Sequence, residues 1–264
     1  MNAPATATED LIYAVEDGIA RLTFNRPQAR NALTFAMYER MAAICEAVNA
    51  DHSIKAMILT GAGEKAFASG TDISQFRAFK TSQDALDYEA RIDRVLGALE
   101  QVRVPTIAAI AGACTGGGAG IAACCDMRIG TASTRIGFPI ARTLGNCLSM
   151  ETYARFVDLL GTSVVKDVIF RARFLTAQEA LAAGYVHEIV APEEIEARVK
   201  DIALEIAGHA PITLQVTKES LRRIRDHRGL PDGDDLVART YTSADFREGA
   251  AAFIEKRKPR WTGK

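Results

Sequence analysis

The sequence predicts a layered α/β fold followed by an all-helical C-terminal region. Strand-like and helix-like segments alternate from the N-terminus onward, an order typical of layered α/β cores. From Ala191 only helical patterns remain, interrupted at Pro211 and over 229–233. We therefore expect a core over residues 1–195 and a helical tail over 196–264, which is long enough to pack against the core or a second subunit.

The first elements expected are a hairpin, a helix and a strand. Strand-like residues 12–15 and 19–24 flank a turn at Glu16-Asp17-Gly18. Apolar residues recur with helical spacing over 35–50, and residues 54–60 have the composition of a strand. The apolar face of the helix consists of Met37, Met41, Ile44 and Val48.

A small-residue loop and a second helix come next. Residues 65–73 are rich in Ala, Ser and Gly and fit neither a clear helix nor a clear strand. Such a composition brings backbone close to another group. Over 84–101 one face is polar and the other carries apolar residues from Leu86 to Leu99, which predicts a helix.

Residues 104–125 are uncharged over 22 positions, a length that could span a membrane. Twelve of the 22 are Gly or Ala and Pro105 stands near the start, so too little bulky apolar surface is present to drive insertion. We expect instead a strand over 107–111 that is buried on both faces.

Three successive glycines, Gly116 to Gly118, then form a turn that opens a helix running to about Cys125. A helix start leaves backbone N–H groups unpaired, and glycine lets a ligand approach them, so this turn suits an oxygen with negative charge. Close packing of the helix on a sheet accounts for the glycines equally well. The stretch is not a phosphate-binding P-loop, because no Gly-Lys-Ser/Thr follows.

The remaining core elements are short. In chain order they are strands over 126–129 and 134–138, an untyped segment over 140–149, helices over 149–160 and 164–170, and a strand over 185–190. Before that last strand, Thr176 and Glu179 form a capping box for a short helix that Gly184 ends.

Composition narrows the function classes. The net charge of −1 gives no general electrostatic case for nucleic acid or a membrane surface as partner. The cysteines are odd in number, lie in apolar surroundings and show no C-x-x-C spacing, so we expect buried thiols in a reducing compartment. They are Cys45, Cys114, Cys124, Cys125 and Cys147. The N-terminus has neither the basic residues nor the apolar segment of a secretory or transit signal, and we expect a cytoplasmic protein.

Five stretches, in order and with near-family spacing, together resemble the crotonase (enoyl-CoA hydratase/isomerase) superfamily. They are Asn25–Leu33, Ala66–Ile73, Pro105–Asp126 with its Gly-Gly-Gly and Cys-Asp, Leu175–Val186 and Glu248–Pro259. Any one of these stretches is weak evidence for the family, whereas five in register over nearly the whole chain are strong evidence. The resemblance implies a crotonase-like spiral of ββα units with a C-terminal helical region used in assembly, as homotrimers or dimers of trimers.

The same resemblance implies an activity. Members of the family are lyases and isomerases of fatty acid metabolism that act on acyl thioesters of coenzyme A, and they need no metal or redox cofactor. Their shared chemistry is stabilisation of a thioester enolate by two backbone N–H groups, which fall here on Thr71 and Gly117. Two aimed donors in a dry site stabilise a transition state by several kcal/mol each.

Contacts to coenzyme A are implied by resemblance as well. They fall on Arg30, Ala32, Lys65, Ser69, Asp72 and Ile73, with Phe253 and Lys256 from the C-terminal stretch. Arg30 and Lys65 are expected to face phosphates. A further cationic cluster fits a solvated helix face better than a phosphate site; it consists of Arg222, Arg223, Arg225 and Arg228.

Both carboxylates of the family's hydratases are absent. Hydratases use two glutamates to position and activate water, and isomerases commonly keep the second. The first lies two residues after the three glycines, where this chain has Gly120, and the second follows the proline of the strand end, where it has Ile140. Because an acid–base group contributes about 10² to 10⁴ to a rate, two-glutamate hydration is not expected here.

Other groups near that wall are candidates for moving protons. Residues 140–149 depart from the family's usual Gly-x-x-Pro-Gly-x-Gly-Gly run, and they supply Arg142, Thr143, Asn146, Cys147 and Ser149. The nearest carboxylates are Glu151 in sequence and Glu89 on the preceding helix. Each of these residues also fits a structural role, and no histidine has a spacing that marks it as a base for Cys147.

Three functional hypotheses remain. The first is an enzyme that holds a thioester enolate. Decarboxylation of a β-carboxy acyl-CoA needs only the oxyanion hole, since loss of CO₂ generates the enolate without a base. Hydration or isomerisation with relocated acid–base residues is the alternative reaction. The second is a catalytically silent CoA-ester-binding protein, and the third is an assembly module. Lys65 and the glycine-rich turn favour the first two.

Overall fold

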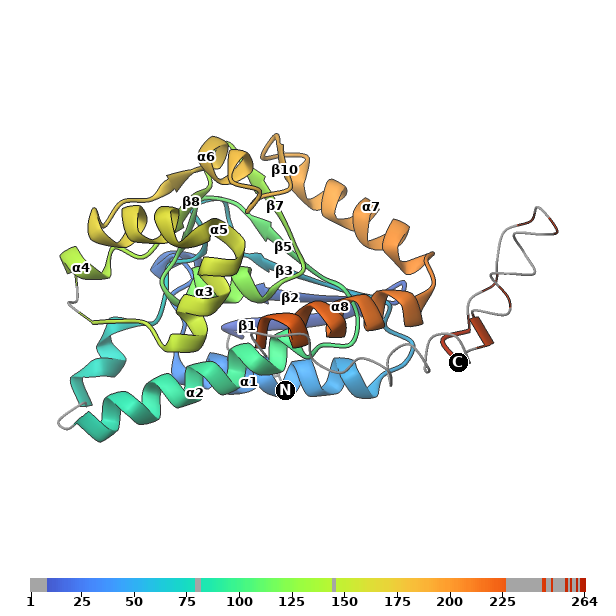
Figure 1. Ribbon diagram of the computed structural model, residues 1–264, viewed down its shortest axis with the longest axis horizontal. Coiled ribbons are helices and arrows are strands. Elements are labelled where there is room, and N and C mark those ends of the chain that lie inside the picture. The colour runs from blue at the N-terminus through green and yellow to red at the C-terminus, as the bar shows by residue number, and fades with distance from the viewer. Residues whose placement is uncertain are drawn as a thin grey trace, which may run out of the picture.

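The computed structural model consists of two β-sheets enclosed by helices (Figure 1). It describes residues 9–78, 82–143 and 146–226, and near the C-terminus 244–245, 248, 255, 257, 260 and 262–264. Within this part of the chain no helix is long and apolar enough to cross a membrane.

The larger sheet has the strand order β1-β2-β3-β5-β7-β10. Its strands are β1 Leu11–Glu16, β2 Ile19–Phe24, β3 Ala56–Gly61, β5 Thr106–Ile110, β7 Met127–Thr131 and β10 Glu188–Val190. The pair β1 and β2 is antiparallel and is the predicted hairpin, turning at Asp17 and Gly18, both with positive φ. All other pairs in this sheet are parallel.

The smaller sheet has the order β4-β6-β8-β9 and explains the spiral. Its strands are β4 Ala66–Ala68, β6 Ala113–Thr115, β8 Arg135–Gly137 and β9 Leu175–Thr176. Three successive pairs, β3-β4, β5-β6 and β7-β8, place their first strand in the larger sheet and their second in the smaller one, and a helix follows each. This is the predicted spiral of ββα units. The expectation that 65–73 holds no strand is wrong, because β4 is too short to show a periodicity.

The helices follow the predicted order closely. They are η1 Pro27–Ala29, α1 Phe35–Ala50, η2 Ile73–Ala78, α2 Ser82–Glu100, α3 Gly117–Cys124, α4 Ile140–Thr143, α5 Met150–Phe170, α6 Ala177–Ala182, α7 Ile195–Ala207 and α8 Pro211–Asp226. The Thr34 hydroxyl caps α1 by accepting from the Met37 N–H at 3.2 Å. At Gly161 (φ 73°) α5 is kinked, which accounts for the two shorter helices expected there. The capping box of α6 is present as predicted.

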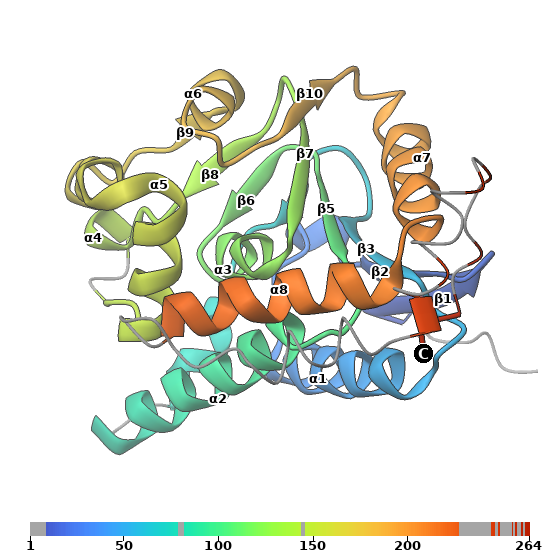
Figure 2. The ribbon, with the colours of Figure 1, turned by 45° about the vertical axis from the view of Figure 1, so that its right-hand side comes forward.

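The central strands of the larger sheet, β3, β5 and β7, are buried on both faces. Helices α1, α2 and α3 lie on one side of it, and α7 lies on the other (Figures 1 and 2). Ile195, Val199 and Ile202 of α7 share a core cluster with Ile107 of β5 and Ile129 of β7. The strand predicted over 107–111 is therefore covered on both faces, and the first helix of the predicted tail forms a layer of the core.

The thiols divide into two groups. Cys45, Cys114, Cys124 and Cys125 are buried as predicted, and burial raises the pKa of each thiol. The prediction is wrong for Cys147, which is exposed, because the segment that carries it runs along the surface between α4 and α5.

Candidate active site

A cavity of about 260 Å³ opens where β4, the start of α3, α2 and the segment around α4 meet. It brings together Thr71, Gly117, Gly120 and Ile140, residues that lie far apart in the sequence. One wall is backbone from the two glycine-containing turns, and the facing walls carry side chains of α2 and of residues 138–152.

The first turn of the backbone wall is held by the chain before α1. Gly70 adopts φ 102°, which an L side chain rarely adopts, and Thr71 follows it. The Leu33 N–H donates to the Gly70 carbonyl and the Asp72 N–H donates to the Leu33 carbonyl, each at 2.8 Å. Thr71 is therefore fixed as a one-residue bridge beside Leu33, with its own N–H left out of the pairing.

The second turn lies against the first. A Cβ added at Gly70 would lie 3.6 Å from the Gly117 nitrogen, so the two turns are in contact. The first bond of α3 joins the Gly120 N–H to the Gly116 carbonyl, which leaves the preceding N–H groups at the positive end of the helix. Within the described residues, neither the Thr71 N–H nor the Gly117 N–H has an acceptor.

Packing requires the glycines as well. A Cβ on Gly117 would lie 2.0 Å from the Tyr38 hydroxyl, and one on Gly118 would lie 2.1 Å from the Ala68 carbonyl oxygen. The packing interpretation of the turn is therefore correct. It does not displace the anion-site interpretation, because Gly117 also lines the cavity.

A chain of three hydroxyls supports this wall. The Thr71 Oγ1 lies 2.9 Å from the Tyr38 hydroxyl and 2.8 Å from the Tyr88 hydroxyl. Burial raises the pKa of both tyrosines, that of Tyr88 to about 12, so both stay protonated at neutral pH. Neither tyrosine was predicted from the sequence; the available signal was that a tyrosine in a buried helix needs a hydrogen-bond partner.

The wall opposite is largely apolar. Ile92 and Leu96 of α2, Phe138 and Ile140 line it. A Cβ on Gly120 would lie 3.3 Å from the Leu96 Cδ1, so Leu96 occupies the space beside that position. Both positions at which the resemblance places hydratase glutamates therefore line the cavity without a carboxylate.

Glu89 of α2 contributes the one carboxylate found in the lining among the described residues. Its side chain is half-buried, and burial first, then the negative charge of Asp93, raises its pKa to about 7. The Ser149 backbone N–H acts in the opposite direction and lowers the pKa of Glu89. Both protonation states of Glu89 are consequently populated at neutral pH.

The other predicted polar groups divide between the cavity and the surface. Thr143, Asn146 and Cys147 line the cavity, whereas Arg142 is exposed outside the lining. Glu151 also lies outside it, with its side chain 64% exposed and 3.2 Å from Arg155. Ser149 also lies outside the lining, and its hydroxyl donates to the Asp93 carboxylate at 2.7 Å.

The residues predicted to contact coenzyme A are found in varied settings. Ser69 and Ile73 line the cavity, and Ile73 is 57% exposed. Arg30 and Lys65 are exposed, Ala32 is half-buried, and Phe253 and Lys256 lie outside the described residues. Asp72 lies 3.1 Å from the Arg26 Nη1, and the Ser74 hydroxyl and Arg26 lower its pKa, so it stays ionised.

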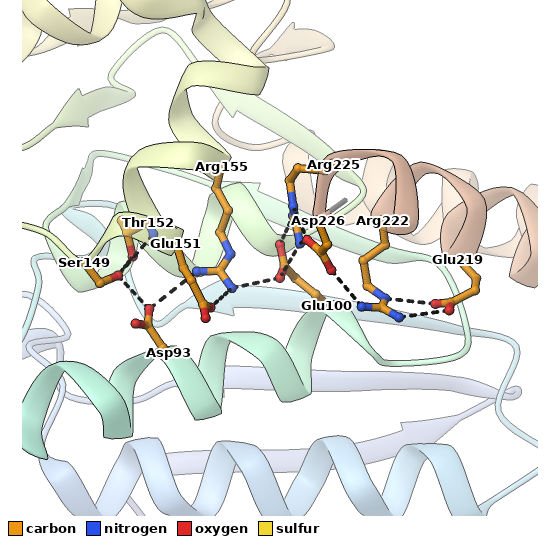
Figure 3. A network of polar contacts seen from close by, with 10 residues as sticks. All are labelled: Asp93, Glu100, Ser149, Glu151, Thr152, Arg155, Glu219, Arg222, Arg225 and Asp226. Carbon is orange, nitrogen blue, oxygen red and sulfur yellow. Dashed lines mark hydrogen bonds and ion pairs between the residues drawn. The ribbon is translucent and has the colours of Figure 1, made fainter. Parts of the chain in front are cut away.

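The cationic cluster on α8 departs from the expected solvated face mainly at Arg225. Arg222 and Arg223 are half-buried and pair with Glu219, and Arg225 pairs with Glu100 of α2. Arg228 lies outside the described residues. Arg225 therefore joins α8 to the core, whereas Arg222 and Arg223 pair with Glu219 of the same helix; Figure 3 shows the pairs of Arg222 and Arg225.

Comparison with known proteins identifies the family. Residues 14–264 match the family model described as "Enoyl-CoA hydratase/isomerase". The chain belongs to this family. A short-chain-enoyl-CoA hydratase of Clostridium acetobutylicum is 33% identical over 94% of this chain and 96% of that protein. A crotonyl-CoA hydratase of Syntrophomonas wolfei is 32% identical over 98% of this chain and 100% of that protein.

Solved structures of the family have the same fold. An enoyl-CoA hydratase/carnithine racemase from Magnetospirillum magneticum superposes with a TM-score of 0.90 at 32% identity, covering 98% of this chain and 97% of the other. A putative enoyl-CoA hydratase/isomerase family protein from Hyphomonas neptunium gives 0.90 at 29% identity, covering 97% and 99%. The predicted crotonase-like fold is thereby confirmed.

Proposed function

We propose that this member of the family is an enzyme that binds an acyl-CoA thioester and holds its enolate on the N–H groups of Thr71 and Gly117. The observation that carries the proposal is the contact between the two turns, which brings two N–H groups without acceptors to one cavity within the described residues. Donors of this kind stabilise charge that develops on a carbonyl oxygen. The enolate then needs no metal or redox cofactor, and we propose none.

We further propose that the reaction is not two-glutamate hydration. The relatives named above as hydratases make hydration the natural first assumption. Gly120 and Ile140 argue against it, because neither can activate water, and Leu96 fills the space beside Gly120. Proton transfer at the carbon next to the thioester carbonyl, as in isomerisation of a 3-enoyl-CoA, asks for one base and the oxyanion hole.

Decarboxylation of a β-carboxy acyl-CoA is the second candidate. The apolar wall of Ile92, Leu96 and Ile140 supports it, because a substrate carboxylate placed there is poorly solvated and its loss as CO₂ is favoured. Loss of CO₂ leaves the electron pair on the α-carbon as the same enolate. A catalytically silent CoA-ester-binding protein is the outcome if neither reaction occurs.

The test compares two variants that differ in a single N–H. Tyr38→Phe removes the hydroxyl that a side chain at position 117 would meet, and proline is tolerated at the first position of a helix. Y38F/G117P therefore lacks the Gly117 N–H, and Y38F/G117A keeps it with the same added Cβ. The substrates are but-3-enoyl-CoA and malonyl-CoA in D₂O, analysed by mass spectrometry and NMR.

We expect the proline variant to be about 10²- to 10³-fold slower than the alanine variant. Equal rates contradict the role of Gly117. Deuterium at C2 with formation of crotonyl-CoA identifies isomerisation, loss of CO₂ identifies decarboxylation, and gain of water contradicts the argument from Gly120 and Ile140. Butyryl-CoA binding without any of these products overturns the proposal in favour of a silent homologue.

We also propose assembly as a homotrimer or a dimer of trimers in the cytoplasm. Apolar side chains left exposed on α8, Leu221 at 63% and Ile224 at 52%, support an interface with another subunit. The four buried thiols fit a reducing compartment. Light scattering coupled to size-exclusion chromatography tests the assembly, and a monomer contradicts it.

A further inference from the structure

We propose that Glu89 is the residue that removes and returns protons at the α-carbon of the bound thioester. This inference rests on the acyl-CoA function proposed above and assigns to α2 a task for which the resemblance supplies no residue. Its starting point is geometric: Glu89 lines the same cavity as Thr71 and Gly117, and within the described part of the chain no other carboxylate does.

The position of Glu89 on its helix directs it into the cavity. Ile92 and Leu96, one and two turns later on the same face of α2, line the cavity with it. The neighbouring Tyr88 also lines the cavity and is bonded to Thr71 at 2.8 Å, so this turn of α2 is tied to the backbone wall.

The other carboxylates near the cavity lie within ion-pair distance of a cation. Asp93 accepts from the Ser149 hydroxyl at 2.7 Å and lies 3.7 Å from Arg155. Glu151 pairs with Arg155, and Asp72 pairs with Arg26. Figure 3 shows Asp93 and Glu151 converging on Arg155. Among the described residues no cation forms an ion pair with Glu89.

The charged and titratable groups around Glu89 set its response to pH. Burial raises the pKa of Glu89 most, and the negative charge of Asp93 raises it further, to about 7. Tyr88 and Tyr38, which face the same region, stay protonated because burial raises the pKa of both. Cys147, from the segment before α5, also lines the cavity. The Arg155 guanidinium pairs with Asp93 and Glu100.

The proton transfer balances without a co-reactant. The Glu89 carboxylate takes the proton from C2 of a 3-enoyl thioester, and the C–H electron pair moves into the dienolate whose oxygen accepts from the two N–H groups. Protonated Glu89 then gives that proton, or one exchanged with solvent, to C4, and the double bond moves to C2–C3. In a decarboxylation the same protonated Glu89 gives its proton to the α-carbon after CO₂ leaves.

The test measures deuterium incorporation at C2 of but-3-enoyl-CoA in D₂O between pH 5 and 9. The variants are E89Q, which keeps the shape of the side chain, E89D, which keeps the carboxylate, and the matched control E151Q, which changes an exposed glutamate outside the cavity. Binding of butyryl-CoA and cooperative unfolding are measured for every variant, so that a misfolded protein is recognised.

We expect the wild-type rate to rise with pH and to level above about pH 7. E89Q should be about 10²- to 10⁴-fold slower with no rise near pH 7, E89D should keep a reduced but pH-dependent rate, and E151Q should behave as wild type. An E89Q protein with the wild-type rate and pH profile overturns the inference. So does a wild type that binds butyryl-CoA without exchange, whereas absence of butyryl-CoA binding contradicts the proposed function itself.

Discussion

Two glutamates of helix α2, one near its middle and one at its C-terminus, are held in opposite ways. At the C-terminal end Glu100 is 8% exposed and is bound by Arg155 at 3.0 Å and by Arg225. Near the middle of the helix Glu89 is half-buried and has no cation paired with it among the described residues. The first arrangement joins α2 to α5 and α8 (Figure 3); the second leaves a carboxylate that can change its charge.

This difference distinguishes a carboxylate that stabilises the fold from one that can transfer protons. A buried charge is retained when cations and hydrogen bonds compensate its lost hydration, as they do for Glu100. Without a cation, the pKa rises until the neutral form competes near the working pH, which suits proton transfer. The following predictions test this contrast, from the largest expected effect to the smallest.

Replacing the compensated carboxylate should destabilise the fold strongly. Glu100→Gln leaves the charges of Arg155 and Arg225 without their common partner, and the Arg155 side chain is only 4% exposed. Breaking a buried pair in this way costs about 3–5 kcal/mol. Urea unfolding at pH 7.5 measures the loss, with E151Q as the control expected within about 0.5 kcal/mol of wild type. A loss below about 1 kcal/mol for E100Q shows that the network contributes little.

Replacing Glu89, the carboxylate without a paired cation, should increase the stability of the fold at high pH. The pKa of folded Glu89 is raised from 4.5 to about 7, so its contribution to stability is complete at acidic pH and is lost as pH rises through 7. Above pH 7 the wild type holds a charge that E89Q lacks. We expect E89Q to equal wild type near pH 4 and to exceed it by about 1–2 kcal/mol at pH 8.5, a value discounted for partial exposure. Lower stability of E89Q at pH 8.5 contradicts the contrast.

Replacing Asp93, which lies between Glu89 and Glu100 on α2, should shift the pKa of Glu89 without removing its carboxylate. The charge of Asp93 raises the pKa of Glu89, so D93N should lower that pKa and move the levelling of the exchange rate below pH 7. Asparagine keeps an acceptor for the Ser149 hydroxyl, which limits other effects. The pH profile of deuterium exchange measures the shift, and an unmoved profile means that Asp93 does not act on Glu89.

Much of the fold followed from local patterns. The α1 helix, the hairpin and the α6 capping box depend on neighbours in sequence, and each was predicted. The three-residue strands β4 and β6 form only because β3-β4 and β5-β6 stack side by side, a condition that no short window contains. The exposure of Cys147 was not predicted either, because its apolar neighbours in sequence do not reveal that the segment lies at the surface.

The candidate site was predictable where it is made of backbone and less so where it is made of side chains. Thr71 and Gly117 were placed by resemblance, because the glycines beside them mark tight turns. The hydroxyls of Tyr38 and Tyr88 meet Thr71 only through the packing of α1 and α2. Glu89 was one of several carboxylates in the sequence, and only the cavity and the ion pairs of its neighbours distinguish it.

The most direct test of this account is a carbon-13 NMR titration of glutamate side-chain carboxyls in the free protein, with the Glu89 signal assigned by its absence in E89Q. The account predicts that this signal titrates at about pH 7, since burial and Asp93 act together. A midpoint near 4.5, the ordinary value for glutamate, would show that Glu89 is a solvated surface charge and would contradict its assignment as the proton-transfer group.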